Sequence, residues 1–219
     1  QFGLPAHRRP ILRGTRLRTL DGMSATMTDA YEIPQELLDF RDTIRQIVQE
    51  KVAPRAHDID ADAEYPWDIR KLFAENDILG LPFSEEHGGT GTGTLMQSIA
   101  VEEIAKACAS SSLILMVQEL GTLPITLFGS DELKARFLPK CASGEWSPAF
   151  ALSEPEAGSD PAAMRTSAKL DGDEWVINGQ KAWITNAGIA DFYVVLASTD
   201  REGRKTTAFV VEKERAGLS

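Results

Sequence analysis

Two short segments of the chain carry the residues with the greatest chemical potential. Residues 151–160 read Ala-Leu-Ser-Glu-Pro-Glu-Ala-Gly-Ser-Asp, so flexible Gly158 stands beside the hydroxyl of Ser159 and the carboxyl of Asp160. A turn of such small residues can aim successive backbone N–H groups at an anion such as a phosphate. Residues 178–186 read Asn-Gly-Gln-Lys-Ala-Trp-Ile-Thr-Asn and offer an indole and a further hydroxyl. Taken alone, a Gly-Ser-Asp turn is usually only a turn, and a hairpin aromatic usually belongs to a core.

Other reactive residues have plainer interpretations. Glu102 and Glu103 are adjacent, and adjacent helical positions do not face each other, so we expect one solvated and one partly buried carboxylate. The glycine loop 88–93 lacks the Gly-Lys-Thr ending of a P-loop and is interpreted as a connector between helices. Cys108 and Cys141 have neither zinc-site nor disulfide-framework spacing, which predicts free thiols. The three histidines are scattered singly, so we expect no metal site.

Composition narrows the class of protein. The net charge is −10, which argues against a nucleic-acid binder, since such a protein needs a basic face. No uninterrupted apolar run approaches the roughly 20 residues that span a bilayer, so we expect no transmembrane segment. Residues 1–28 hold five arginines and one aspartate, a net charge of +4. This leader is either an upstream extension, with a bacterial cytoplasmic location, or a targeting peptide for the mitochondrial matrix, because such peptides are Arg-rich and acid-poor.

The first half of the chain has the periodicity of helices. Apolar residues recur at helical spacing in several segments, and proline or glycine closes each of the first two. We expect one helix at 36–52, ended by Pro54, and a second at 67–78, ended by Gly80. Two buried helices are expected within 95–128, separated near 109–112, and Pro124 should start or kink the last turn. A further helix should be capped by Ser130 and end near Pro139.

The pattern changes to that of strands after residue 146. Asn178-Gly179 predicts a type I′ turn in a hairpin of residues 174–177 and 180–184. Two more strands, 192–197 and 206–211, are joined by a turn at 200–204, and both look like apolar edge strands in need of partners. The fold class is therefore α+β in sequence, with an all-α N-terminal domain at 29–146 and a partial antiparallel β-domain at 147–219.

These segments together resemble a known family. Residues 151–160, with Ala163 after them, fit the first signature of the acyl-CoA dehydrogenases, and residues 178–186 look like its second conserved block. Residues 80–89 and 130–145 resemble the first helical-domain loop and the segment before the flavin loop. The resemblance covers about residues 30–219 and implies that the family's C-terminal helical bundle is missing from this chain.

The resemblance also implies FAD and a set of residues that hold it. Residues 150–153 would line the isoalloxazine edge, and Gly158 and Ser159 would hold the pyrophosphate. Trp183 would pack against the flavin ring system. Thr185 would lie near N5, and Ser159 would also lie near the acyl-CoA. The implied cofactor-binding set is Phe150, Ala151, Leu152, Ser153, Gly158, Ser159, Trp183, Ile184 and Thr185, with Ser159 as the substrate-binding residue.

The family's reaction is the α,β-dehydrogenation of acyl-CoA thioesters to trans-2-enoyl-CoA in fatty-acid or branched-chain amino-acid catabolism. The resemblance implies a catalytic glutamate beyond Ser219, so we assign no catalytic residue and expect the fragment alone to be inactive. It also implies electron-transferring flavoprotein as acceptor and a homotetramer. Alternatives are an acyl-CoA oxidase or flavin monooxygenase relative, and a non-catalytic truncated product. Glu156 departs from many relatives, and a carboxylate there must point away from a pyrophosphate.

Overall fold

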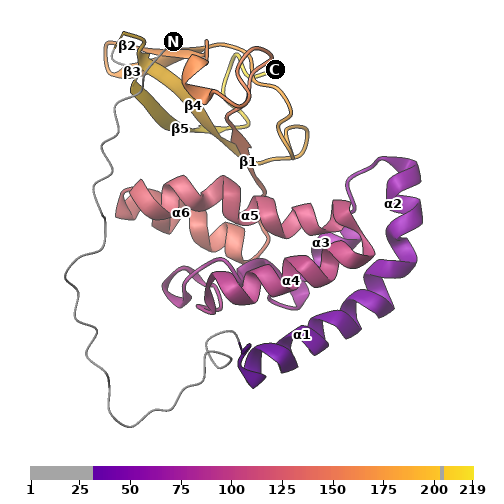
Figure 1. Ribbon diagram of the computed structural model, residues 1–219. Coiled ribbons are helices and arrows are strands. Elements are labelled where there is room, and N and C mark those ends of the chain that lie inside the picture. Colours follow the sequence, from indigo (N-terminus) through magenta and orange to yellow (C-terminus); the bar gives the residue numbers. More distant parts are fainter. Residues whose placement is uncertain (1–31, 203–204) are drawn as a thin grey trace, which may run out of the picture. The chain divides into compact units, whose positions relative to one another are not determined.

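Helices come first along the chain and strands follow (Figure 1), which confirms the predicted fold class. The computed structural model describes residues 32–202 and 205–219, and residues 35–219 form one unit. The predicted leader at 1–28 lies outside the described residues, as does part of the predicted turn at 200–204.

The helix predicted at 36–52 is divided, and helical turns continue beyond its predicted end. Helix α1 covers Gln35–Ile47 and passes through a π-helical turn at Val48–Val52 and a 3₁₀ turn into helix α2, Ala56–Asp62. The expected stop at Pro54 is wrong, because this proline lies in the first turn of the 3₁₀ segment, where a missing N–H costs nothing. The sequence pattern also missed α2.

The second predicted helix is shorter than expected. Helix α3 covers Trp67–Glu75. Asn76 ends it by donating from its amide to the carbonyl of Leu72 at 2.8 Å, and Asp77 takes a left-handed φ of 55°. A 3₁₀ turn at Ile78–Gly80 follows.

Two buried helices come next, and their predicted separation is confirmed. Helix α4 covers Gly93–Ala107 and helix α5 covers Ala109–Phe128, with extended Cys108 between them. The Sγ of Cys108 caps α5 by accepting a hydrogen bond from the N–H of Ser111 at 3.4 Å. Pro124 starts no separate element, since α5 continues past it to Phe128.

Helix α6, Asp131–Ala142, begins with the cap that the sequence predicts. The Oγ of Ser130 accepts a hydrogen bond from the N–H of Leu133 at 3.3 Å. The predicted end near Pro139 is wrong, because the helix runs on to Ala142, and the side chains of Leu138 and Cys141 around the proline are fully buried.

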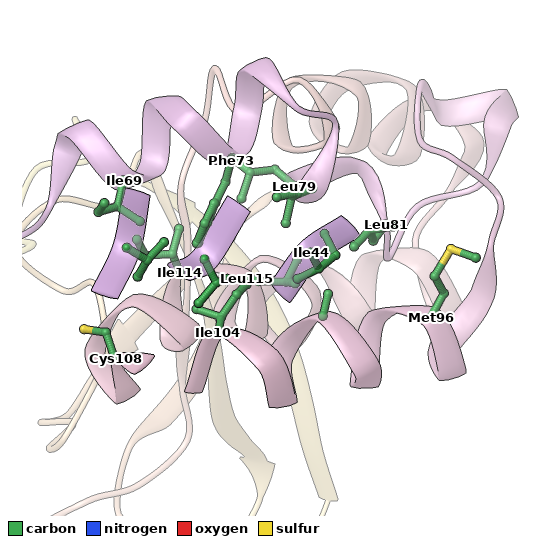
Figure 2. Packing of buried hydrophobic residues seen from close by; sticks show 14 of the residues in the cluster. Ile44, Ile69, Phe73, Leu79, Leu81, Met96, Ile104, Cys108, Ile114 and Leu115 are labelled. Atoms are coloured by element: carbon green, nitrogen blue, oxygen red, sulfur yellow. The ribbon is translucent and has the colours of Figure 1, made fainter. Parts of the chain in front are cut away.

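The helices enclose a core of packed hydrophobic side chains (Figure 2). Its most deeply buried members come from the π-helical turn, from α3 and the 3₁₀ turn after it, and from α4 and α5, and include Val52, Phe73, Leu79, Ile104 and Leu115. A second cluster joins the helices to the sheet through Phe137 of α6 and Phe192, whose rings meet edge to face with centroids 4.7 Å apart.

The pair of adjacent glutamates confirms its predicted asymmetry. Glu103 is 3% exposed and accepts hydrogen bonds from Arg45 at 2.9 Å and Lys106 at 2.8 Å. Glu102 is exposed and meets the same Lys106 ammonium at 2.7 Å. The two carboxylates are therefore parts of an ion-pair network and not an acid–base pair. Both cysteines are free, as expected, and both are buried.

The five strands form one mixed sheet. They are β1 Pro148–Ala151, β2 Ser167–Asp171, β3 Glu174–Asn178, β4 Phe192–Asp200 and β5 Lys205–Glu212. The antiparallel pairing of the two strands predicted at 192–197 and 206–211 is confirmed as β4 with β5. β2 and β3 are also antiparallel, although no strand was predicted at 167–171, and β1 runs parallel to β4. One parallel bridge between Ser167 and Ser198 attaches β2 to β4.

The expectation that residues 192–197 form an edge strand is wrong. β5 pairs along the whole of β4, while β1 and β2 follow one another along its other side. The strand is therefore central, which explains why Phe192, Val194 and Ala197 are fully buried. In the described part of the chain, β5 pairs with β4 alone.

Helix α5 is unusually apolar. Within the described residues, it is the one helix whose length and composition suffice to cross a membrane, although half of it is buried in the fold. The amide of fully buried Gln118 donates to the carbonyls of Cys141 and Trp146, and Gly121 lies against Pro148. These contacts are those of a core helix that supports β1.

Candidate functional site

The first candidate segment follows directly after strand β1 and forms a hydrogen-bonded turn. Glu154 and Ala157 exchange two backbone hydrogen bonds, of 3.0 and 3.2 Å, across this turn. Gly158 and Ser159 follow on the surface, and a Cβ added to Gly158 meets nothing within 4 Å. The carboxylate of Asp160 then accepts the N–H of Ala162 at 3.2 Å and caps a short 3₁₀ turn. The small-residue segment is thus open to a ligand.

The second candidate segment lies beside the first but is not a strand. Lys181 Nζ donates to the carbonyl of Leu152 at 2.9 Å, and the N–H of Ala182 donates to the carbonyl of Ser153 at 2.9 Å. Further along, the Asn186 amide donates to the carbonyl of Pro148 at 3.2 Å. The structure therefore brings together the two segments that the sequence singled out.

The predicted hairpin around Asn178-Gly179 is wrong. β3 pairs with β2 through the turn at Gly172, whose φ is 61°, and residues 180–184 leave the sheet. Gly179 does not serve a type I′ turn. Instead it passes against Thr166, so closely that a Cβ would lie 2.5 Å from the Thr166 Cα.

Trp183 is the most conspicuous residue of the second segment. Its side chain is 93% exposed, and its backbone has a φ of 60°, an unusual conformation for a non-glycine residue. Its neighbour Ile184 is half-buried, and Thr185 is exposed. A large indole held out from strained backbone beside a loop of small residues is a surface suited to a planar aromatic ligand.

A buried ion pair links the two segments, and sequence reasoning missed it. Glu154 is 4% exposed, and its carboxylate lies 2.8 Å from Lys181 Nζ. It also accepts the N–H groups of Arg165, at 2.5 Å, and Thr166, at 3.0 Å. Burial alone would raise the pKa of Glu154, but the hydrogen bonds from Lys181 and these amides outweigh it and lower the pKa to about 2. No spacing signal finds a pair 27 residues apart.

The carboxylate of Glu156, which the motif requires to point away from a pyrophosphate, is paired with a cation of the chain. This carboxylate lies 3.7 Å from the guanidinium of Arg165, and both side chains are exposed. The negative charge of Glu156 therefore faces the positive charge of Arg165. Across the described ranges, no cluster of three or more metal-ligating side chains is present.

The donor set therefore fits a large ligand with a planar ring and an anionic group. The exposed indole of Trp183 and the loop at 151–153 offer the ring a surface, and the open Gly158-Ser159 turn offers an anion backbone and hydroxyl donors. A dinucleotide flavin has both features.

Comparison with known families agrees with this geometry. The model described as "Acyl-CoA dehydrogenase, N-terminal domain" matches residues 34–145, and the one described as "Acyl-CoA dehydrogenase, middle domain" matches residues 149–219. The chain belongs to the acyl-CoA dehydrogenase family. The match covers both the helices and the sheet, while the predicted domain bounds at 29–146 and 147–219 stay a prediction.

Individual members of the acyl-CoA dehydrogenase family are similar over most of this chain. A probable acyl-CoA dehydrogenase of Mycobacterium leprae is 41% identical over 193 residues, which cover 87% of this chain and 50% of the relative. A glutaryl-CoA dehydrogenase from Mycobacterium smegmatis, solved in complex with FADH2, matches with a TM-score of 0.79 at 33% identity, over 84% of this chain and 47% of that one.

The chain is also similar to a chain in a solved structure of an electron transferring flavoprotein. The structure described as "Electron transferring flavoprotein of Acidaminococcus fermentans: Towards a mechanism of flavin-based electron bifurcation" contains a chain that matches with a TM-score of 0.80 at 33% identity. The match covers 85% of this chain and 50% of that one. The present chain thus spans about half the length of the relatives it matches.

Proposed function

We propose that the protein containing this chain is an FAD-dependent dehydrogenase that converts acyl-CoA thioesters to trans-2-enoyl-CoA. The observation that carries the proposal is exposed Trp183, held beside the loop 151–153 by the hydrogen bonds from Lys181 and Ala182. The similarity to a glutaryl-CoA dehydrogenase in complex with FADH2 supports FAD as the cofactor. When bound, FAD supplies the acceptor for the hydride that leaves the acyl β-carbon.

In this proposal the residues of this chain bind the FAD and orient its ring system. Residues 150–153 flank the flavin edge, and the indole of Trp183, with Ile184 behind it, covers the ring system. Thr185 offers its hydroxyl to the same ring, and the open turn of Gly158 and Ser159 holds the pyrophosphate. Ser159 also lies toward the acyl-CoA. We propose these roles because each residue is in one of the two adjoining segments.

The proton acceptor is proposed to lie outside residues 1–219. Glu154 is buried in the candidate site, but Lys181 and two backbone amides already occupy its carboxylate and hold its pKa at about 2. A base of that pKa is poorly matched to removing an α-proton near neutral pH. Isolated residues 1–219 are therefore expected to bind ligands without turnover.

The proposal extends to partners and setting. The similarity to a chain of an electron-transferring flavoprotein structure supports such a protein as electron acceptor. A homotetramer and a role in fatty-acid or branched-chain amino-acid catabolism rest on the family resemblance. A bacterial cytoplasmic location is proposed if residues 1–28 are an upstream extension. A mitochondrial matrix location is the alternative if the Arg-rich leader is a targeting peptide.

The test is an anaerobic titration of the full-length protein, purified with FAD, against a series of saturated acyl-CoAs. Bleaching of the flavin absorbance with formation of trans-2-enoyl-CoA is expected. Reoxidation by electron-transferring flavoprotein rather than by oxygen separates a dehydrogenase from an oxidase or monooxygenase. A full-length protein that retains no FAD contradicts the proposal.

A further inference from the structure

The ion pair of Glu154 and Lys181 is the most deeply buried one in the described part of the chain. The side chains are 2% and 10% exposed, and their charged atoms lie 2.8 Å apart. Every other ion pair in that part of the chain has at least one side chain exposed by more than a third. A pair so enclosed at a ligand site needs an explanation.

The contacts of this pair converge from three separate segments. Lys181 joins the second candidate segment to the carbonyl of Leu152 at 2.9 Å as well as to Glu154. The Glu154 carboxylate in turn holds the N–H groups of Arg165 and Thr166, just before β2. Besides each other, the ammonium and the carboxylate therefore bind backbone groups of residues 152, 165 and 166.

Stability alone is a weak reason to bury such a pair. Desolvation of two charges offsets much of their attraction, and a well-packed apolar pair often does as well. What an apolar pair cannot do is fix the separation of two backbone segments by directed hydrogen bonds. The pair does this between residue 152 and residue 181, two residues before exposed Trp183.

We propose that Glu154 and Lys181 are positioning residues that set the distance between the 151–153 loop and Trp183, and thereby the fit of the flavin between them. This inference rests on the proposed function, since it concerns the same site. Neither side chain is proposed to touch the reacting atoms.

The first test compares Glu154→Gln with Glu156→Gln in the full-length protein. Both changes remove one carboxylate charge from the same turn, but Glu156 is exposed and lies 3.7 Å from the exposed guanidinium of Arg165. We expect Glu154→Gln to weaken FAD affinity about tenfold, which corresponds to ~1.4 kcal/mol, and to shift the bound-flavin absorbance. Glu156→Gln should match the wild type. Equal affinity and equal spectra in both variants overturn the inference.

The second test removes the cation. Lys181→Met should weaken FAD affinity as Glu154→Gln does, whereas Lys181→Arg keeps the charge and should retain most of the affinity. In the FAD-free proteins, amides at 152–154 and 181–183 should exchange hydrogen faster in Lys181→Met than in the wild type. Unchanged exchange in both segments contradicts a positioning role.

The double variant Glu154→Gln/Lys181→Met covers the case in which a single variant fails to fold, because it leaves no unpaired buried charge. Loss of FAD affinity in a cooperatively folding double variant supports the inference, and wild-type affinity in it overturns the inference. If the wild-type protein itself does not bind FAD, the proposed function fails along with the inference. If the wild type and Glu156→Gln bind FAD and Glu154→Gln binds it equally well, only the positioning role fails.

Discussion

Gly179 and Thr166 pack backbone against backbone, so closely that a Cβ on Gly179 would lie 2.5 Å from the Cα of Thr166. This contact sits where the chain leaves β3 and starts toward Trp183, and Thr166 also donates its N–H to Glu154. The glycine therefore acts here through its lack of a side chain and not through a turn conformation.

We expect Gly179→Ala to destabilise the protein by about 2 kcal/mol, because the added methyl group forces rigid backbone apart. Gly188→Ala is the matched control, since a Cβ at Gly188 meets nothing within 4 Å and its backbone is not left-handed. Urea unfolding of the two variants beside the wild type measures the effect. A Gly179→Ala variant as stable as Gly188→Ala would show that the contact relaxes freely.

The buried carboxylate of Glu103 should make stability depend on acid pH. Hydrogen bonds from Arg45 and Lys106 outweigh burial and lower its pKa from 4.5 to about 2. A lowered pKa means that the stabilisation is complete above pH ~4.5, the value expected in the unfolded chain, and is lost as pH falls toward ~2.

Glu103→Gln should accordingly cost on the order of 3 kcal/mol at pH 7, and the difference from wild type should shrink at pH 3. Glu102→Gln, at an exposed position on the same helix, should change stability by less than ~1 kcal/mol at either pH. Unfolding free energies from denaturant titrations at the two pH values check this. A Glu103→Gln deficit that does not vary with pH contradicts the assignment.

Trp183→Ala should separate ligand affinity from stability. Because the indole is 93% exposed, the FAD-free variant should lose less than ~0.5 kcal/mol of folding free energy, while FAD affinity falls by ~1.5 kcal/mol or more. Trp67→Ala should instead leave FAD affinity unchanged and cost more folding free energy, since the Trp67 ring, although 54% exposed, meets the Tyr65 ring edge to face with centroids 4.7 Å apart. Fluorescence titration with FAD and thermal unfolding of the apoproteins give the two quantities.

Thr185→Ala should lower FAD affinity less than Trp183→Ala does. Removing one hydrogen bond to the bound ring is expected to cost ~1 kcal/mol of FAD affinity and to shift the flavin absorbance. The exposed hydroxyl makes no contribution that would alter the unfolding of the apoprotein. Unchanged affinity, spectrum and rate in both Thr185→Ala and Trp183→Ala would remove these residues from the site.

Helix α5 should make residues 1–219 associate when expressed alone. Its solvent face carries a stripe of exposed apolar side chains at spacings of three and four residues, namely Leu113, Met116, Leu120, Leu123 and Leu127. Soluble monomers seldom expose a continuous patch of this kind. Replacing Leu120 and Leu123 with Glu should reduce light scattering and hydrophobic-dye binding.

Leu95→Glu is the control for this experiment, because Leu95 is equally exposed but lies in the first turn of α4, outside the stripe. It should leave association unchanged. A wild-type chain that runs as a sharp 24 kDa monomer and binds no dye would contradict the prediction.

Local sequence signals succeeded wherever the chain's near neighbours decide the conformation. The cap at Ser130, the break between α4 and α5, and the pairing of residues 192–197 with 206–211 all depend on contacts within a few residues or across one turn. The signals at Pro54 and Pro139 failed for different reasons. Pro54 lies at the start of a 3₁₀ turn, where its missing N–H costs nothing. Pro139 lies inside α6, which continues past it with Leu138 and Cys141 packed in the core.

The sequence by itself determined the order of helices and strands and the two segments that form the candidate site, since periodicity and residue type are local properties. Only the tertiary structure decided that Asn178-Gly179 forms no hairpin, that Trp183 stands exposed, and that Glu154 meets Lys181. These outcomes depend on where Thr166 and the 151–153 loop lie in space. Contacts between residues 13 to 30 positions apart follow the path of the whole chain, which no local pattern encodes.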